Sequence, residues 1–305
     1  MTNTAPYILV PEYTLLKNLP LHQRKRFEIA LDLMHSEERT GLAWQEIAAQ
    51  SAISPYHFHR HFTRVFHETP GNYLSRIQLQ WAVSMLLESP SIKVTDVAFE
   101  CGYSSSQALA KALKRELNLT AKAIKAIGLT GSVPELKQVL EPLGHRVTPE
   151  DAPLEIQLAE NLPCRVEEFE QRAIRLEKIP DEGFDTLCDI LGSKICDLAM
   201  LTPVKMLDQP WNIDCHWVGK WCPPNHKAVD QKIVPSGEFL VCECYIASDM
   251  GYLSALEGME KQGKKMGLKP YWEGICVEQV LELDNSLTGG IVLRIEVPVI
   301  WETQN

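Results

Sequence analysis

Apolar residues in the first half of the chain recur at the spacing of amphipathic helices. Between residues 55 and 66 they lie at i, i+4, i+7 and i+8, and they are Phe58, Phe62, Val65 and Phe66. That spacing puts them in one stripe on a helix and leaves polar residues on the other side. Ser54 can cap such a helix and Pro55 fits its first turn, so we expect the helix to begin there.

An eight-residue pattern occurs twice, 50 residues apart, as IAAQSAIS in residues 47–54 and VAFECGYS in residues 97–104. Both copies read apolar, Ala, three variable residues, small, apolar, Ser. Gly102 supplies a left-handed turn residue, and Ala52 stands where a glycine would be easier. We expect the last serine of each copy to cap the helix that follows. Each copy therefore predicts a helix-turn-helix unit.

The second helix of each predicted unit carries a basic polar edge. Past the turn the register of the repeat slips by one residue, so that Phe58, Phe62 and Phe66 correspond to Leu109, Leu113 and Leu117. On the polar edge, the same shift pairs Tyr56 with Gln107, Arg60 with Lys111, and Arg64 with Arg115.

A longer helix is predicted between the two units, from Thr69-Pro70 to about Ser89. Its apolar residues cover most of its circumference, which is typical of a helix buried between two partners. About 19 residues at about 1.5 Å each span about 28 Å. That length is close to the roughly 34 Å between successive major grooves on one face of B-DNA, so the two units suit adjacent turns of a duplex.

The second half of the chain has a different pattern. Residues 128–162 hold several Pro and Gly and predict a linker with one short helix near 134–140. Residues 163–303 predict strands and helices in alternation: two strands in 165–179, a helix at 182–195, strands around 204–207 and 215–222, a strand at 237–246, a helix at 250–263, and strands at 275–283 and 289–299. Gly183-Phe184 and Gly251-Tyr252 repeat at 68 residues and indicate a duplicated strand-helix-strand unit.

Alternation along these strands assigns the faces of the predicted sheet. Ile275, Val277, Leu281 and Leu283 are expected to face the helices, and Glu278, Val280, Glu282, Arg294 and Glu296 to face away. A groove on the outer face would then hold an aromatic or cationic ligand. Its expected lining is Glu278, Tyr245, Phe239, Trp217 and Trp221. An ordinary solvated sheet face gives the same alternation, and Arg294 would neutralise Glu278 if the two were paired.

Charge divides the chain into the same two halves. The 305 residues carry a net charge of −10. Residues 20–127 hold 13 basic and 10 acidic residues, whereas residues 128–305 hold 16 and 29. A mildly basic half joined to a strongly acidic half favours two partners of opposite charge. No apolar run approaches the length of a membrane span and no signal peptide is evident at the N-terminus, so we expect a cytoplasmic protein.

Two groups of residues contain side chains that can bind a metal ion. His57 and His61 would lie one turn apart on a helix with His59 rotated away, so at most two of the three could share an ion. A second set lacks the short cysteine spacing of most structural zinc sites, and comprises Cys215, His216, Cys222 and His226. We therefore expect no metal and no cofactor.

Residues 40–127 resemble the DNA-binding domain of the AraC/XylS family of bacterial transcription regulators, in SPYHFHRHFTRVFHETPGNYL and VTDVAFECGYSSSQALAKALKREL. The resemblance implies an all-α double helix-turn-helix domain, within residues 20–127, that binds double-stranded DNA, with RNA polymerase as a further partner. It places in the major groove Tyr56, His57, His59 and Arg60 of the first unit, and Ser106, Gln107 and Lys111 of the second.

The chemistry of these side chains agrees. Arg60 has the planar fork that pairs with guanine, Gln107 has an amide that can pair with adenine, and Lys111, Arg64 and Arg115 offer charges for phosphates. The sequence departs from the family in having Leu109 and Leu113 for Phe, His61 for an apolar residue, and Ala121 for Pro. These changes concern packing more than the recognition edge.

Residues 163–303 resemble the GyrI-like effector-binding domain, in the Rob-like order of domains, through IVPSGEFLV and VEQVLEL. The resemblance implies an α+β domain that binds a small-molecule effector near Glu278, although Val280 replaces the usual Tyr. Some GyrI-like domains are thought to hydrolyse small molecules, which would make Glu278 a general base. The chain offers no clear nucleophile triad, so we expect a regulator rather than an enzyme.

Overall fold

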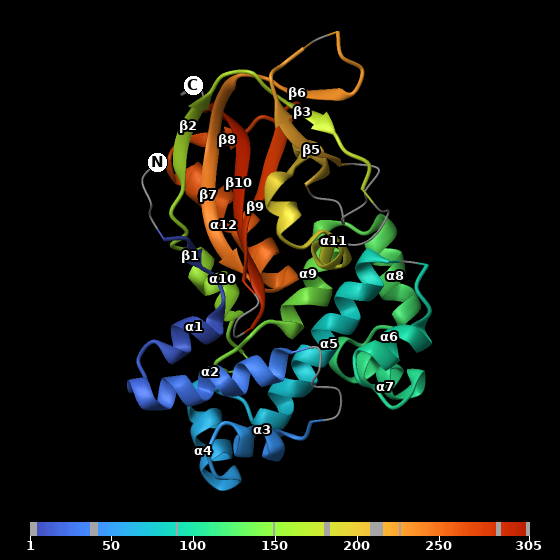
Figure 1. Cartoon of the computed structure of the whole chain (residues 1–305), viewed down its shortest axis with the longest axis vertical. Coiled ribbons are helices and arrows are strands. Elements are labelled where there is room, and N and C mark those ends of the chain that lie inside the picture. The colour runs from blue at the N-terminus through green and yellow to red at the C-terminus, as the bar shows by residue number, and fades with distance from the viewer. Residues whose placement is uncertain are drawn as a thin grey trace.

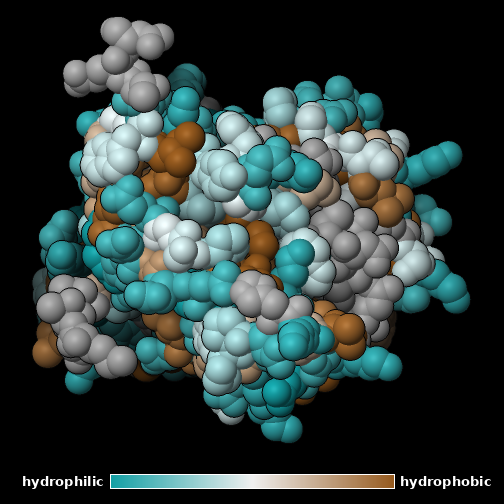
Figure 2. Space-filling view, turned by 90° about the horizontal axis from the view of Figure 1, so that it is seen from above, coloured by the Kyte–Doolittle hydropathy of each residue, from teal (hydrophilic) through white to brown (hydrophobic). Residues whose placement is uncertain are grey.

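The computed structural model describes residues 5–36, 42–89, 91–148, 150–179, 184–207, 216–225, 227–284 and 288–302. The helices of residues 11–130 gather at one end of the molecule and the sheet of residues 165–301 at the other (Figure 1). Seen from the sheet end, the surface is mostly hydrophilic, and hydrophobic residues show in separate areas (Figure 2). Among the described helices, none is long and apolar enough to cross a membrane.

The first helix-turn-helix unit follows α2 (Leu21–His35) and consists of α3 (Trp44–Gln50) and α4 (Pro55–Phe66). The predicted stripe of α4 is confirmed, because Phe58, Phe62 and Phe66 are fully buried. Helix α4 begins at Pro55 as expected, but the Ser54 side chain makes no cap hydrogen bond. The turn before it places Ala52 at a φ of 54°, in the left-handed region that glycine adopts more easily.

The second unit consists of α6 (Val94–Glu100) and α7 (Ser106–Leu117), and is followed by α8 (Ala121–Thr130). Its turn residue, Gly102, has a φ of 76°. The cap of α7 is Ser105 rather than the expected Ser104: the Ser105 hydroxyl accepts from the Ala108 N–H at 3.2 Å. Because the cap lies one residue later than in the first unit, α7 starts one residue later. The register slip seen in the sequence has this cause.

Helix α5 (Pro70–Glu88) links the two units, as predicted. The Thr69 hydroxyl caps it by accepting from the Asn72 N–H at 3.2 Å. Tyr73 and Ile77 lie in the buried core of the first unit. That of the second holds Leu79, Ala82, Val83, Leu86 and Leu87. Trp81 packs against both cores, so α5 holds the two units together.

The sheet follows the order β1-β7-β10-β9-β4-β5-β3-β6, with β2 also on β7 and β8 also on β10. Its strands are β1 (Tyr7–Ile8), β2 (Arg165–Phe169), β3 (Arg172–Leu176), β4 (Ala199–Pro203), β5 (Trp217–Cys222), β6 (Gln231–Val234), β7 (Gly237–Ile246), β8 (Leu268–Pro270), β9 (Ile275–Asp284) and β10 (Gly290–Trp301). The helices of this half are α11 (Phe184–Leu191), α12 (Asp249–Lys265), and the 3-10 turns η3 (Gly192–Asp197) and η4 (Val204–Met206).

Two expectations about the strands were wrong. Residues 204–207 do not form a strand, because the strand ends at Pro203 and the chain turns into η4. From Ile275 to Val280 the faces of β9 are also reversed: Cys276, Glu278 and Val280 lie on the helix side, and Val277 packs on the other face.

The reversal has a local cause in the pairing of β9 with β10. Leu293 is opposite Val280 whereas the preceding Val292 is opposite Glu282, so β9 carries one extra residue at a bulge. A strand that alternates on both sides of such a bulge changes phase there. Leu283, which follows the bulge, therefore lies on the helix side together with Val280, which precedes it. The alternation that places Leu283 on that side does not continue back to Val277.

The N-terminal segment and the connecting segment both touch the two halves. Strand β1 adds in parallel to β7, and α1 (Pro11–Leu16) contributes Leu16 to the core of the first helix-turn-helix unit. Residues 128–162 contain α9 (Val133–Leu140), which confirms the predicted short helix, and also η2 (Glu141–Leu143) and α10 (Leu154–Ala159). Leu140 and Leu143 lie in the second helical core and Ala159 in the core of the sheet, so this segment is packed along its length.

Candidate nucleic-acid interface and ligand cavity

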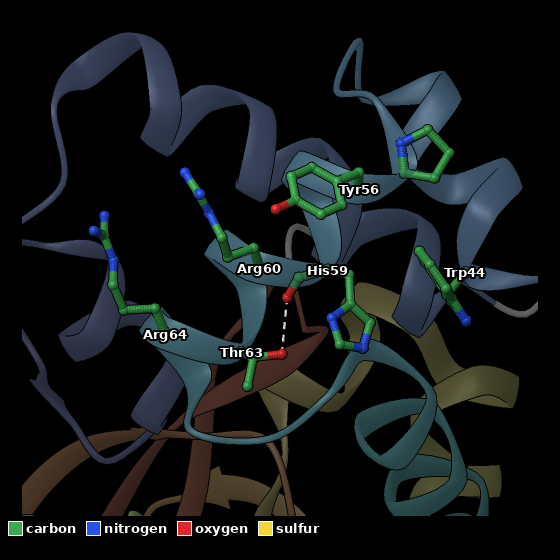
Figure 3. Close-up of a pocket in the computed structure, with 7 residues that line it drawn as sticks. Trp44, Tyr56, His59, Arg60, Thr63 and Arg64 are labelled. Carbon is green, nitrogen blue, oxygen red and sulfur yellow. Dashed lines mark hydrogen bonds between the residues drawn. The ribbon is translucent and has the colours of Figure 1, made fainter.

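Helix α4 presents one polar face to solvent. Tyr56, His57, His59, Arg60 and Arg64 are exposed, and the Tyr56 side chain is 70% exposed. Figure 3 shows Tyr56, Arg60 and Arg64 on one side of the helix, a turn apart from one another. The buried phenylalanine stripe holds the opposite side, so these groups are directed away from the core. An aromatic ring and two guanidinium groups in one row suit the edges of bases and the phosphates of a duplex.

Two further side chains complete this face. An open hollow of about 630 Å³ is lined by Trp44 and Thr63 together with Pro55, Tyr56, His59, Arg60 and Arg64. The Thr63 hydroxyl donates to the His59 carbonyl at 2.8 Å (Figure 3). The Trp44 ring lies 5.5 Å from the His59 ring. Trp44 was missed from the sequence because it belongs to α3, and only the crossing of the two helices brings it here.

The histidines of α4 have separate environments. The His57 and His61 rings are 6.2 Å apart, and His61 is half-buried, as expected of a packing residue. Burial lowers the pKa of His61, and Arg64 and Arg60 lower it further. His61 is therefore neutral at physiological pH and adds no charge beside Arg60 and Arg64.

Helix α7 presents a second face of the same kind. Gln107, Lys111 and Arg115 are exposed and Ser106 is half-buried. Ser106 Oγ lies 3.4 Å from Gln107 Oε1. Arg115 pairs with the neighbouring Glu116 at 2.5 Å, so a phosphate would have to compete with that carboxylate. The two faces belong to separate units at the two ends of α5 (Figure 1).

The predicted ligand groove is not assembled as expected. Phe239, Trp217 and Trp221 pack together on the sheet face away from α12. The protein's own cations already cover these rings: the Arg172 guanidinium lies 5.0 Å from the Trp221 centroid, and Lys232 Nζ lies 3.4 Å from that of Trp217. Tyr245 is further along the same face, where its ring meets the edge of Tyr13 at 5.3 Å.

Arg294 does not neutralise Glu278, because it lies on the opposite face of the sheet. Its guanidinium pairs with Glu167 at 2.8 Å, Glu243 at 2.6 Å and Glu296 at 2.7 Å. Burial alone would lower its pKa, but these carboxylates keep the pKa of Arg294 above its ordinary value. Arg294 therefore belongs to an ion-pair network of the outer face.

Glu278 lies on the inner face, in a cavity between the two halves of the molecule. Its carboxylate is 3% exposed and accepts from the Tyr252 hydroxyl at 2.7 Å. Burial raises the pKa of Glu278 to about 6, and the bond from Tyr252 opposes that rise. The cavity has a volume of about 980 Å³, and its lining on the sheet side includes Phe184, Met200 and Leu293. Tyr252 was missed as a site residue, although the Gly251-Tyr252 repeat had drawn attention to it.

The cysteine and histidine set weighed for zinc is only partly described. His216 Nδ1 lies 2.6 Å from the Thr202 hydroxyl, and burial lowers the pKa of His216 to about 4. Cys215 and His226 lie outside the described residues. Gly183, the first residue of the predicted repeat, lies outside them as well.

Comparison with known proteins identifies one segment. Residues 47–126 match the family model described as "Helix-turn-helix domain". The HTH-type transcriptional activator RhaS of Klebsiella pneumoniae (strain 342) is 33% identical over 84 residues, which is 28% of this chain and 30% of that protein. Across the first curated relatives, the chain matches 30% to 42% of their length. Residues 47–126 are a helix-turn-helix domain, as the repeat predicted.

Two solved structures are similar to parts of the chain. The DNA-binding domain of AdpA, in complex with a target DNA, is 27% identical and covers 30% of this chain and 82% of that chain, with a TM-score of 0.28. The protein SAV2435, bound to tetraphenylphosphonium, is 11% identical and covers 46% of this chain and 94% of that chain, with a TM-score of 0.31. The GyrI-like assignment of residues 163–303 stays a prediction.

Proposed function

We propose that this chain is a transcriptional regulator of the AraC/XylS type, which binds a specific DNA duplex through α4 and α7 and a small cationic effector near Glu278. The observation that carries the DNA-binding part is the pair of exposed polar faces on α4 and α7, whose units are joined by helix α5. Within the described residues of α4, no carboxylate accompanies Arg60 and Arg64 on the exposed face. The phosphates of a duplex would therefore meet uncompensated positive charge there.

A selection experiment tests the DNA-binding part. The full chain is incubated with a pool of random duplexes at about 0.15 M salt, near physiological ionic strength, and the retained duplexes are sequenced. We expect one motif with two conserved blocks separated by about one helical turn, because the two recognition helices sit at the two ends of α5. Enrichment of no motif, or retention that disappears equally for all sequences at moderate salt, would contradict the proposal.

The effector part is supported by one buried carboxylate at a large, partly apolar cavity. A desolvated carboxylate attracts a cation more strongly than a surface carboxylate does. The Tyr252 hydroxyl donates to Glu278 and fixes the position of its carboxylate, which we assign as a ligand group. A rigid lipophilic cation such as tetraphenylphosphonium is a suitable probe, since its aromatic groups match the apolar lining.

The variant Glu278→Gln tests this part directly, because it keeps the size of the side chain and removes its charge. We expect at least tenfold weaker binding of tetraphenylphosphonium by isothermal titration calorimetry, and little change for a neutral ligand of the same shape such as tetraphenylmethane derivatives made soluble by hydroxyl groups. Equal affinity of both proteins for the cation would refute a role for the Glu278 charge.

A further inference from the structure

One stripe of helix α5 lines the cavity over most of the length of the helix. The stripe residues recur at i, i+3, i+4, i+7, i+11 and i+14, and they are Leu74, Ile77, Gln78, Trp81, Met85 and Glu88. At about 1.5 Å per residue, this stripe spans about 21 Å. The cavity is therefore elongated, and the helix that joins the two helix-turn-helix units forms one of its long walls.

The opposite wall comes from the other half of the molecule. It includes Phe184 and Met200, Tyr252 of α12, and Ile291 of β10. Cys101 and Gly102, in the turn between α6 and α7, also reach the cavity. A molecule that fills this space would touch both the sheet domain and the turn that positions a recognition helix.

The two ends of the cavity differ in polarity. At one end, Ser84 of α5 is hydrogen-bonded to the Asp249 carboxyl, Asp249 lies one turn from Tyr252, and Tyr252 donates to Glu278. Glu88 ends the α5 stripe on the same side, one turn beyond Ser84. At the other end the stripe begins with Leu74 and Ile77, near Leu42 and Ile47. Glu100 and His35 also line the cavity, and His35 Nε2 lies 2.7 Å from the Tyr73 hydroxyl. Among the described lining residues none is Lys or Arg.

We propose that the effector is an elongated amphiphile with a cationic head and an apolar tail, bound between the two domains. The head lies at Glu278, Asp249 and Glu88, and the tail runs along α5 toward Leu74. This inference rests on the proposed effector function, and adds to it the shape of the ligand and the contribution of the DNA-binding domain to the site. Because ligand atoms then contact the DNA-binding domain itself, occupancy and operator binding are coupled through direct contacts.

A series of alkyltrimethylammonium ions, from octyl to hexadecyl, tests the shape of the site. Binding to the full chain is measured by isothermal titration calorimetry at about pH 8, above the pKa of Glu278, with each ion below its micelle concentration. We expect affinity to rise by roughly threefold to fourfold for each added methylene until the tail fills the α5 wall. Affinity that is already constant from octyl onward would overturn the elongated site.

Three variants locate the head and the tail. Leu74→Asn, at the far end of the stripe, is expected to remove the gain between dodecyl and hexadecyl and to leave octyl binding unchanged. Glu278→Gln is expected to weaken every member of the series by a similar factor. Asp32→Asn removes a carboxylate from the exposed surface of α2. We expect it to change neither the gain from longer tails nor the affinity for any member of the series. Thermal melting of each variant establishes that it is folded.

The outcomes separate the two proposals. If no member of the series binds, the cationic-effector function itself fails. If all bind in a Glu278-dependent way but Leu74→Asn leaves the chain-length dependence intact, the effector function stands and the shared cavity is refuted. Should Leu74→Asn not fold, Leu42→Asn provides the same test, because the half-buried Leu42 lines the same end of the cavity, and we expect loss of the long-chain gain.

Discussion

Arg60 and Lys111 occupy matching positions on the two recognition helices but differ in what they can bind. The fork of Arg60 can donate two parallel hydrogen bonds to a guanine, whereas the ammonium group of Lys111 acts as a point charge for phosphate. Both side chains are exposed, and Arg60 lies over the Tyr56 ring at 5.9 Å, which limits its freedom. The two residues therefore make different predictions.

Arg60→Ala is expected to weaken binding to the selected duplex by about 1 to 3 kcal/mol and to relax preference at one base pair. Lys111→Ala is expected to weaken binding to all duplexes alike and to reduce the salt dependence by about one phosphate contact. Fluorescence anisotropy with the selected duplex and single-position variants of it, at several salt concentrations, measures both effects. A uniform loss in Arg60→Ala would reassign Arg60 to the phosphate backbone.

Glu278 makes the unliganded protein less stable at neutral pH. Its folded-state pKa of about 6 lies above the ordinary value of 4.5, so its stabilising protonated form is present below pH 4.5 and is lost as the pH rises through 6. The difference corresponds to about 2 kcal/mol. We expect Glu278→Gln to be more stable than wild type by about that amount near pH 8 and similar to it near pH 4.5. Urea unfolding at both pH values measures this, and equal stability near pH 8 would contradict the desolvation of Glu278.

The face on which a side chain lies could be predicted for a residue of a single helix. It could not be predicted for a residue whose orientation depends on how strands pair in the sheet. The exposed face of α4 followed from the spacing of its three phenylalanines. Glu278 was identified as a candidate, but its face was misassigned because a bulge in β9 changes the phase of the strand. Arg172 of β3 stacks on Trp221 of β5, and no pattern within either strand predicts this contact.

The turns of the two helix-turn-helix units differ in one residue type at the same position. Ala52 and Gly102 hold the same left-handed turn position, at φ values of 54° and 76°. A residue with a Cβ atom is strained in this conformation by about 1 kcal/mol. Ala52→Gly is therefore expected to stabilise the chain by up to about 1 kcal/mol, and Gly102→Ala to destabilise it by at least as much, since the added Cβ would also meet the Gln78 side chain at 3.3 Å. Thermal melting of both variants provides the comparison, and a lower melting temperature for Ala52→Gly would contradict the strain.

Helix α1 is held by a buried charged cluster. The Glu12 carboxylate accepts from Tyr73 at 2.9 Å and lies 3.3 Å from His145 Nδ1, and Arg76 bridges to Glu68 at 2.6 Å. Burial alone would raise the pKa of Glu12, but His145 and Arg76 hold it well below its ordinary value. The ionised Glu12 carboxylate therefore stabilises the folded state. This contribution is present above pH 4.5 and is lost as the pH falls toward the folded-state pKa of Glu12.

Glu12→Gln is expected to destabilise the chain by about 3 kcal/mol at neutral pH, because His145 and Arg76 lose a buried partner charge. Glu28→Gln is the matched control: it breaks the half-buried surface pair of Glu28 with Arg24 on α2, and we expect a loss of under about 1 kcal/mol. Urea unfolding near neutral pH compares the two. A loss from Glu12→Gln no larger than that of the control would contradict the structural role of the cluster.

At the scale of the whole molecule, the division into a basic helical half and an acidic sheet half was readable from composition and repeats. The contacts between the halves were not. The packing of α9 and α10 against two different cores and the shared cavity along α5 join residues far apart in the sequence. Which segments α9, α10 and α5 contact depends on tertiary packing, and the periodicity within each helix does not predict it.

The pairing of β1 with β7 has a consequence for how the chain is made. Tyr7 and Ile8 lie opposite Cys244 and Tyr245, so β1 is synthesised more than 200 residues before the strand with which it pairs. Meanwhile α1, which follows it, already has a place in the first helical core. During synthesis the helical half can therefore form around α1 while Tyr7 and Ile8 have no strand with which to pair. Completion of the sheet then fixes β1, and only the folded sheet allows residues 7–16 to join both halves of the molecule.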